Sequence, residues 1–318
     1  MNPNVAKISE LLSGGHFEKA RIELARTVES DFTDQRRSVA CEPEGSKIDR
    51  VVFICGLHRS GTTLLYDHLA SEFDFSRFQG TGVPCDEGQF LQSVYPLEKA
   101  FGGPGTFAFS QQISKLPAGK MQNEPVQELG RRVLAEWSAK ATHSASRVLL
   151  EKSPANIVRI GFLRQLFPNS KFIIWTRDPR AVSMATLKWH SLPVSTHMWH
   201  WHCAYSRALE DLESDCLICR YEAFCDDPVS QTNAIAKFVG VQPREIPQET
   251  KDKFRTIINT NDQYVDKFPK NECLFRSQVL MWELFGYDIP LERKQGKFRK
   301  RRAGLKGKVK RLIRRLVS

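Results

Sequence analysis

The sequence predicts an α/β protein in which a parallel sheet is covered by helices on both faces. Short apolar runs recur along the middle of the chain, and a segment with helical periodicity follows each of them. Apolar residues at successive positions indicate strands that are buried on both faces, as in parallel sheets between two helix layers. The first run also leads into a glycine-containing loop of the P-loop-like, phosphate-binding kind.

The apolar runs also give the places of the expected strands. In the first run, VVFIC, every residue is apolar, and a helix is expected from Gly61 to Phe73 directly after the loop. The third run precedes Asp178 and Pro179, a pair that commonly starts a helix. Ligands of such sheets bind at the carboxyl ends of the strands, where we expect the functional site. The strands are expected at 51–55, 147–151, 171–176 and 215–221.

The alternation is interrupted between residues 80 and 146, which are rich in glycine, proline and aromatic residues. One helix is expected there, around Val126–Trp137, and we interpret the segment as an insertion that faces the substrate. An N-terminal helical hairpin is expected either to pack on the main domain or to dock a partner. The expected organisation is a helical hairpin at 1–35, a linker at 36–49, the main domain at 50–292 and a basic tail at 293–318.

The positive charge of the chain is concentrated in its tail. The net charge is +11, and 13 of the 47 Lys and Arg residues lie from Arg293 onward, where no Asp or Glu occurs. The apolar residues of this tail recur with helical spacing, which predicts a basic amphipathic helix. We expect this helix to dock on an anionic membrane surface, with an acidic or nucleic-acid partner and packing on its own domain as alternatives. The apolar residues are Leu305, Val309, Leu312, Ile313, Leu316 and Val317.

Targeting signals and cysteines indicate the compartment. No apolar run is long enough to cross a membrane, and the N-terminus has no signal-peptide pattern. The eight cysteines have no framework spacing, which is typical of free thiols in a reducing compartment. The close pair Cys216 and Cys219 is expected in a buried strand, with metal or redox chemistry as the alternative. We therefore expect a cytoplasmic protein, with peripheral binding to the inner face of the membrane as the location that the tail favours.

The glycine-containing loop is the first chemical signal. Gly56 and Gly61 have the spacing of nucleotide-hydrolase loops, G-x-x-x-x-G-K-[ST], but Thr62 stands where those loops have lysine. The positive charge comes instead from Arg59, inside the loop. Amides of such a loop and of the following helix bind anions, and the hydroxyls of Thr62 and Thr63 can reach phosphate oxygens. The pattern predicts phosphate binding without routine ATP hydrolysis.

Four segments of the chain carry a resemblance to a known enzyme family. The loop GLHRSGTTLL is similar to the 5′-phosphosulfate loop of sulfotransferases, especially tyrosylprotein sulfotransferases and their bacterial relatives. LLEKSPANI resembles the E-K-[ST]-P segment of glycan sulfotransferases. The other two segments are similar to the R-D-P-R-A turn and the R-Y-E-D-L segment of the same family. The four segments lie at 56–65, 149–157, 167–185 and 219–228.

The resemblance implies the sulfotransferase fold and transfer of a sulfuryl group from 3′-phosphoadenosine 5′-phosphosulfate to an acceptor hydroxyl, without a metal ion. It mildly favours a glycan or glycolipid as the hydroxyl-bearing acceptor. A small-molecule kinase that uses ATP and magnesium, and a non-catalytic nucleotide-binding partner protein, are the alternatives. The residues expected to hold the 5′-phosphosulfate are Arg59, Ser60, Gly61, Thr62 and Thr63.

Three further residues receive roles from the resemblance. Lys152 is expected to contact the transferring group or the bridging oxygen, with a plain surface lysine as the alternative. Arg177 is expected to bind the 3′-phosphate, unless an ion pair with Asp178 or Glu222 occupies it. Tyr221 is expected near the adenine, with a core aromatic role almost as well supported.

One position departs from the family pattern. Many members have a serine that binds the 3′-phosphate eight residues after the arginine corresponding to Arg177, and this position is Ala185 here. Ser183 is the first candidate to replace it, and Thr186 the second. On a helix, Ser183 points about 160° away from Ala185, so it serves only if the turn is not yet helical there.

The acceptor hydroxyl needs a general base, because a neutral alcohol is a poor nucleophile. Glu87 lies in a DEGQF segment that resembles the E-x-x-F segment of glycan sulfotransferases, and it is our first candidate. Asp86, or a histidine such as His58 or His190, is the alternative. The non-catalytic alternative is that Glu87 lies there only because acidic residues are favoured in the first turn of a helix.

The segment HMWHWHC suggests a metal site, but its spacing argues against one. His197, His200 and His202 do not share a helical face at i and i+4, and no nearby carboxylate completes a ligand set. We therefore expect no metal. Trp199 and Trp201 are expected to pack beneath the cofactor or acceptor pocket.

Overall fold

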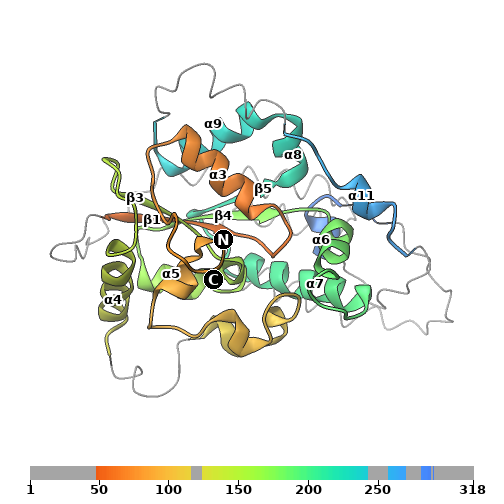
Figure 1. The fold of residues 1–318 in the computed structure, drawn as a ribbon, viewed down its shortest axis with the longest axis horizontal. Helices are drawn as coiled ribbons and strands as arrows, with labels where there is room; N and C mark the ends of the chain where they lie inside the picture. The colour runs from red at the N-terminus through yellow and green to blue at the C-terminus, as the bar shows by residue number, and fades with distance from the viewer. Residues whose placement is uncertain (1–47, 116–123, 243–256, 270–280, 288, 290–318) are drawn as a thin grey trace, which may run out of the picture.

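The computed structural model describes residues 48–115, 124–242, 257–269, 281–287 and 289. Their central element is a five-stranded sheet with the order β2-β3-β1-β4-β5, in which every neighbouring pair is parallel. Helices lie on both sides of this sheet (Figure 1). The predicted fold class, a parallel sheet between two helix layers, is therefore confirmed.

The strands of the sheet lie close to their predicted places. The strand β2 was not expected, because a two-residue edge strand has no apolar pattern that the sequence can reveal. The strands are β1 (Arg50–Cys55), β2 (Ser76–Arg77), β3 (Val148–Lys152), β4 (Lys171–Thr176) and β5 (Cys216–Arg220). Cys216 and Cys219 are free and buried within β5, as expected.

Helices follow each of the longer strands. The expected helix after the loop is α3, and the expected helix within the insertion is α4. The α-helices are α3 (Thr62–Glu72), α4 (Val126–Ser138), α5 (Ile160–Leu166), α6 (Pro179–Thr186), α7 (Val194–Glu210), α8 (Tyr221–Asp226), α9 (Pro228–Val239), α11 (Asp262–Val265) and α12 (Met281–Leu284). The 3-10 helices are η2 (Pro84–Asp86), η3 (Gly88–Leu91), η4 (Glu98–Phe101), η5 (Phe107–Phe109), η6 (Gln112–Ser114) and η8 (Pro154–Val158).

Alternate apolar residues of the four longer strands enter two separate hydrophobic cores. In β1, Val52 and Ile54 face the core beneath α3, α8 and α9, whereas Phe53 and Cys55 face the core formed with α4, α5 and α7. All four side chains are fully buried. Because successive side chains of a strand point to opposite faces, a strand between two helix layers must be apolar throughout. This burial explains the continuous apolar runs of the sequence.

Several sequence expectations concern the ends of the chain. The helical hairpin at 1–35, most of the linker at 36–49 and the basic tail at 293–318 lie outside the described residues. Within the described residues, no helix combines the length and the apolar character that a membrane crossing requires.

Candidate active site

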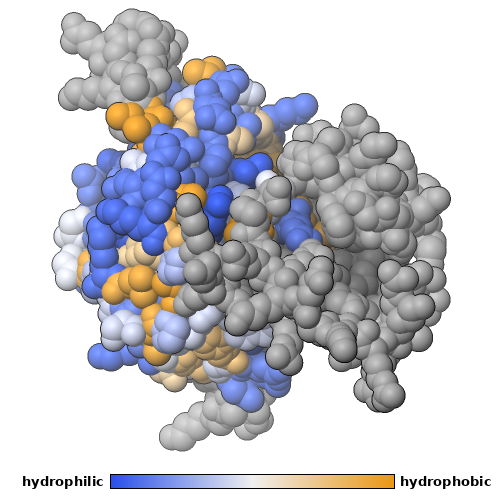
Figure 2. All heavy atoms as spheres, turned by 90° about the vertical axis from the view of Figure 1, so that its right-hand side faces the viewer, coloured by the Kyte–Doolittle hydropathy of each residue, from blue (hydrophilic) through white to orange (hydrophobic). Residues whose placement is uncertain are grey.

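The sheet order brings the predicted site residues to one edge. The strand β1 lies between β3 and β4, so the loop after β1 has the end of β3 on one side and the end of β4 on the other. Lys152 is the last residue of β3, and Arg177 directly follows β4. Figure 2 views this side of the molecule, where hydrophilic residues cover much of the described surface.

The loop has the geometry of an anion-binding turn. Gly61 is the N-cap of α3 with φ of 93°, and no side chain of the described residues caps the helix, so the amides of its first turn can bind a ligand. Arg59 also has a positive φ, 65°, and its guanidinium lies 5.0 Å from the ring centre of Trp189. The amide and the hydroxyl of Ser60 both donate to the carbonyl of Leu57, at 3.1 and 2.6 Å, and shape the turn from inside.

Both glycines of the loop are required by close packing. A side chain on Gly56 would lie 2.6 Å from the carbonyl oxygen of Trp175, and one on Gly61 would lie 3.0 Å from the ring of Tyr221. The indole of Trp175 also donates to the carbonyl of Ser60 at 2.9 Å. The loop backbone therefore packs so closely against Trp175 of β4 and Tyr221 of α8 that neither glycine has room for a Cβ atom.

Glu87 and Lys152 form a buried ion pair beside this loop. The Nζ atom of Lys152 lies 3.2 Å from Oε1 of Glu87 and also donates to the carbonyl of Cys85 at 3.3 Å. Their side chains are 8% and 3% exposed, so Lys152 is not a surface lysine. Burial raises the pKa of Glu87, while Lys152 and a hydrogen bond from Gln89 at 2.7 Å act in the opposite direction. A carboxylate of raised pKa beside a cation can accept a proton during a reaction.

A second carboxylate, Glu151, fixes the turn that carries Glu87. It is fully buried and accepts hydrogen bonds from the amide of Gly88 at 2.9 Å, from the hydroxyl of Ser153 at 2.6 Å and from the amide side chain of Asn156. Burial raises the pKa of Glu151 to about 6. A side chain on Gly88 would lie 2.8 Å from this carboxylate, so the glycine is required by the close approach.

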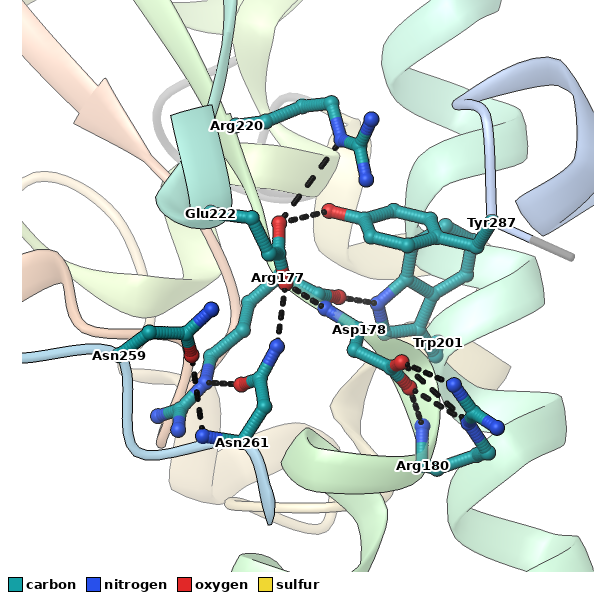
Figure 3. A network of polar contacts seen from close by, with 9 residues as sticks. All are labelled: Arg177, Asp178, Arg180, Trp201, Arg220, Glu222, Asn259, Asn261 and Tyr287. Carbon is teal, nitrogen blue, oxygen red and sulfur yellow. Dashed lines mark hydrogen bonds and ion pairs between the residues drawn. The ribbon is translucent and has the colours of Figure 1, made fainter. Parts of the chain in front are cut away.

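Arg177 lies at the opposite side of the loop and forms no ion pair among the described residues. Its guanidinium stacks on the ring of Tyr221 at 4.2 Å and donates to the carbonyl of Arg59 at 3.2 Å. The alternative that Asp178 or Glu222 occupies Arg177 is therefore wrong. Asp178 instead pairs with Arg180 at 2.6 Å and caps α6, as Figure 3 shows.

A family model described as "Sulfotransferase family" matches residues 51–245, which include the loop, Glu87, Lys152 and Arg177. The chain belongs to the sulfotransferase family. It is 29% identical over 208 residues to protein-tyrosine sulfotransferase 2 of Gallus gallus, an alignment that covers 62% of this chain and 52% of that protein. The chain thus spans about half the length of this curated relative.

Solved structures of sulfotransferases are also similar. The sulfotransferase domain from the Synechococcus PCC 7002 olefin synthase is 19% identical with a TM-score of 0.43, and the match covers 80% of this chain and all of that domain. Sulfotransferase STF1 from Mycobacterium tuberculosis H37Rv is 14% identical with a TM-score of 0.40, and the match covers 76% and 79% of the two chains. At such values these likenesses carry no information on the roles of residues.

In this sulfotransferase-family chain, the hydroxyl that would replace the family serine has two candidates on α6. Thr186 donates to the carbonyl of Val182 at 2.8 Å, so its hydroxyl is occupied within the helix. Ser183 is fully buried, and its hydroxyl has no hydrogen-bond partner in the described part of the chain. It lines a small cavity with His58, His197 and His200, and none of the residues around the Arg177 guanidinium lines that cavity. The turn is helical at this position, so the condition attached to Ser183 is not met.

The alternative bases have other contacts. The carboxylate of Asp86 accepts from the backbone amides of Gly80 and Thr81 at 3.0 and 2.8 Å and so stabilises the turn between Gly80 and Asp86. The Nε2 atom of His58 lies 2.9 Å from Glu98, and this pair is mostly buried. His190 accepts a hydrogen bond from His197 through its backbone carbonyl. Of the candidates, Glu87 alone contacts Lys152.

The histidine segment lies within α7. No group of three or more His, Cys, Asp or Glu residues that could hold a metal ion occurs among the described residues. Trp201 is fully buried, and its indole donates to the carbonyl of Arg177 at 3.2 Å, so it packs beneath this side of the candidate site. Trp199 is 39% exposed and stacks on His202 instead, because it lies on the outer face of the helix.

Sequence reasoning missed the residues that hold the predicted ones in place. Glu151 stands in the E-K-S-P segment, and the only signal was an ionisable residue within a buried strand. Asn261 donates to Glu222 and accepts from Arg177, but it lies in a segment without any recognised motif. Thr260 contacts both Arg177 and Tyr221 and is equally hidden in the sequence.

Proposed function

We propose that this protein transfers a sulfuryl group from 3′-phosphoadenosine 5′-phosphosulfate to the hydroxyl of an acceptor. The observation that carries the proposal is the placement of two buried cations on opposite sides of one anion-binding loop. Lys152 ends β3, Arg177 follows β4, and the loop after β1 lies between them. A donor with a phosphosulfate at one end and a 3′-phosphate at the other fits this arrangement.

The donor fits the free groups at the site. The helix start at Gly61 has uncapped amides for the 5′-phosphosulfate, and we assign Arg59, Ser60, Thr62 and Thr63 to the same group. We assign the 3′-phosphate to Arg177, because its three hydrogen-bond partners among the described residues are all neutral and none of these residues forms an ion pair with it.

The adenine side is the second part of the donor assignment. Tyr221 is buried, packs against Gly61 and Arg177, and remains our candidate for contact with the adenine. Ser183 is not assigned to the 3′-phosphate, because α6 is already helical there and none of the residues around the Arg177 guanidinium lines the cavity that Ser183 lines. The assignment of Tyr221 is tested by comparing donor analogues with and without the adenine ring.

Glu87 is the proposed general base. The acceptor oxygen attacks sulfur, the bond from sulfur to the bridging phosphate oxygen breaks, and the acceptor proton passes to the carboxylate. Lys152 then stabilises the negative charge that develops on the leaving phosphate, and no metal ion is needed for this step. The contact between Lys152 and Glu87 at 3.2 Å places the two groups side by side for these roles.

The resemblance and the basic tail support proposals for the acceptor and for the location. A glycan or glycolipid hydroxyl fits the resemblance of the E-K-S-P and DEGQF segments to glycan sulfotransferases. The basic tail at 293–318 would then hold the protein at an anionic membrane surface in the cytoplasm, with residues 80–146 facing the acceptor. The hairpin at 1–35 would be a separate element of the same chain.

The test compares donors and one variant of the loop. Purified protein is titrated with the phosphosulfate donor and with ATP and magnesium, and we expect tight binding of the former only. Arg59→Ala is expected to abolish binding of the phosphosulfate donor and to leave the thermal unfolding temperature unchanged. Tighter binding of ATP with magnesium-dependent transfer would establish a kinase instead. Unchanged donor affinity in the variant would show that the loop does not bind the phosphosulfate.

A further inference from the structure

The guanidinium of Arg177 is held by three neutral acceptors. Its Nε donates to Oδ1 of Asn261 at 2.7 Å, Nη1 to the carbonyl of Arg59 at 3.2 Å, and Nη2 to the hydroxyl of Thr260 at 2.9 Å. A guanidinium has five N–H groups, so two remain without an acceptor among the described residues. The side chain is fixed in direction and still has both charge and donors for an anion.

Asn261 lies between Arg177 and Glu222, as Figure 3 shows. Its Nδ2 donates to Oε1 of Glu222 at 2.8 Å, and the same carboxylate oxygen accepts from the amide of Asp178 at 2.8 Å. Arginine can only donate, and an ionised carboxylate can only accept. The amide of Asn261 therefore has a single orientation that satisfies both neighbours.

The second carboxylate oxygen of Glu222 has partners other than Arg177. Its Oε2 accepts from the hydroxyl of Tyr287 at 3.0 Å and lies 3.8 Å from Nε of Arg220. A carboxylate in direct contact with Arg177 would neutralise it and weaken any anion site there. With Asn261 between them, the carboxylate fixes the arginine without pairing with it.

We propose that Glu222 is a positioning residue that acts through Asn261 and directs Arg177 towards the 3′-phosphate of the donor. This inference rests on the proposed function, because it takes the ligand of Arg177 to be that phosphate. It adds two residues, 39 positions apart in the sequence, to the recognition of one phosphate group. Recognition of the rest of the nucleotide does not depend on them.

The experiment measures binding of adenosine 3′,5′-bisphosphate and of adenosine 5′-phosphate, which differ only in the 3′-phosphate. In Glu222→Gln a neutral amide oxygen replaces the charged oxygen that accepts from Asn261 and from the amide of Asp178, so the orientation of the Asn261 amide is held by a weaker hydrogen bond. We expect affinity for the bisphosphate to fall about tenfold, the size of one charge-assisted hydrogen bond, and affinity for the monophosphate to change less than about twofold. Glu213→Gln, which alters an exposed glutamate, is the matched control.

A double-mutant cycle separates positioning from general structural support. Asn261→Ala removes the link, and we expect the same selective loss of bisphosphate affinity. In the Asn261→Ala background, Glu222→Gln should cause no further loss, because its effect passes through the amide. If Glu222→Gln alone lowers the unfolding temperature, the cycle still tests the inference, because it compares the effect of this variant with and without Asn261.

Three outcomes contradict the inference. Equal losses for the two nucleotides, unchanged affinity for both, or additive effects in the double variant would each overturn the role of Glu222. A wild-type protein that binds the two nucleotides equally would instead overturn the assignment of the 3′-phosphate to Arg177, and the role of Glu222 with it. The wild-type measurement therefore distinguishes failure of the proposed function from failure of this inference.

Discussion

Two carboxylate and cation combinations lie at the same edge of the sheet and are built differently. On the β3 side, Glu87 and Lys152 touch directly at 3.2 Å and are both buried. On the β4 side, Glu222 and Arg177 are separated by the amide of Asn261. Direct contact makes the charge state of each partner depend on the other, whereas the separating amide leaves the arginine with its charge available.

This difference suits the two roles that we propose. A general base must change its protonation state in each turnover, and a neighbouring cation adjusts its pKa. A phosphate-binding arginine must keep its charge and its direction throughout. Neutral acceptors fix its direction and do not neutralise its charge. The comparison therefore predicts that variants on the β3 side change the rate and its pH dependence, whereas variants on the β4 side change donor affinity.

The largest effect is expected for Lys152→Ala. This variant loses the cation that we assign to the leaving phosphate, and we expect kcat to fall about 10²–10³-fold, the range of other preorganised charge stabilisers. Steady-state kinetics measure the rate, and titration with adenosine 3′,5′-bisphosphate measures affinity, which should fall far less. Lys140→Ala, at an exposed lysine after α4, is the control. A loss confined to affinity would move Lys152 from catalysis to binding.

The second effect concerns stability and Glu151. Its pKa is about 6 in the folded chain against an ordinary value of 4.5, with burial as the main cause. Because the folded pKa is raised, the free energy of unfolding should decrease as the pH rises from 4.5 to above 6, by about 2 kcal/mol from this group. In Glu151→Gln this decrease should be absent, because glutamine does not titrate. Oδ1 of Asn156 has no hydrogen-bond partner among the described residues and can accept from the new amide.

Urea unfolding at pH 4.5 and pH 7 measures this change. Glu128→Gln, at an exposed glutamate of α4, serves as the matched control and should keep the wild-type pH dependence. An equally steep pH dependence in Glu151→Gln would show that other groups cause it.

A smaller effect is expected for Arg177→Lys. Lysine keeps the charge but loses the planar donor set and the stacking on Tyr221. We expect affinity for adenosine 3′,5′-bisphosphate to fall about tenfold with kcat nearly unchanged, because the 3′-phosphate lies away from the reacting atoms. Isothermal titration gives the affinity, with Arg180→Lys as the control. A kcat loss as large as that of Lys152→Ala would remove the distinction between the two sides.

The smallest effect is expected for Gln89→Leu. Gln89 donates to Glu87 and thereby lowers the pKa of this carboxyl, although burial still raises it overall. Without this hydrogen bond the pKa of Glu87 rises further, so the acid limb of the kcat profile should move to higher pH. The rate at high pH should change little, since Glu87 is then ionised in both proteins. A limb that stays in place would point to a base other than Glu87.

The strands, the loop and the order of the family motifs can be predicted from the amino-acid sequence alone. The apolar runs at β1, β3, β4 and β5 are strong local signals, because strands between two helix layers bury apolar side chains on both faces. The loop residues and Lys152 follow their strands directly, so local sequence places them at the carboxyl edge. The expectation that Ser183 replaces the family serine depended on local helix geometry, and that geometry is unfavourable to it.

Only the tertiary structure decided which charges meet. Lys152 and Glu87 are 65 residues apart, and Arg177 and Asn261 are 84 residues apart. Glu87 lies in a segment of 3-10 turns without periodicity, and its position is set by the buried carboxylate of Glu151. Contacts of this kind depend on strand order and on hydrogen bonds between distant segments, which no local pattern encodes. Local patterns therefore place the candidate site residues at the carboxyl edge, and long-range packing decides which of the described ones form ion pairs.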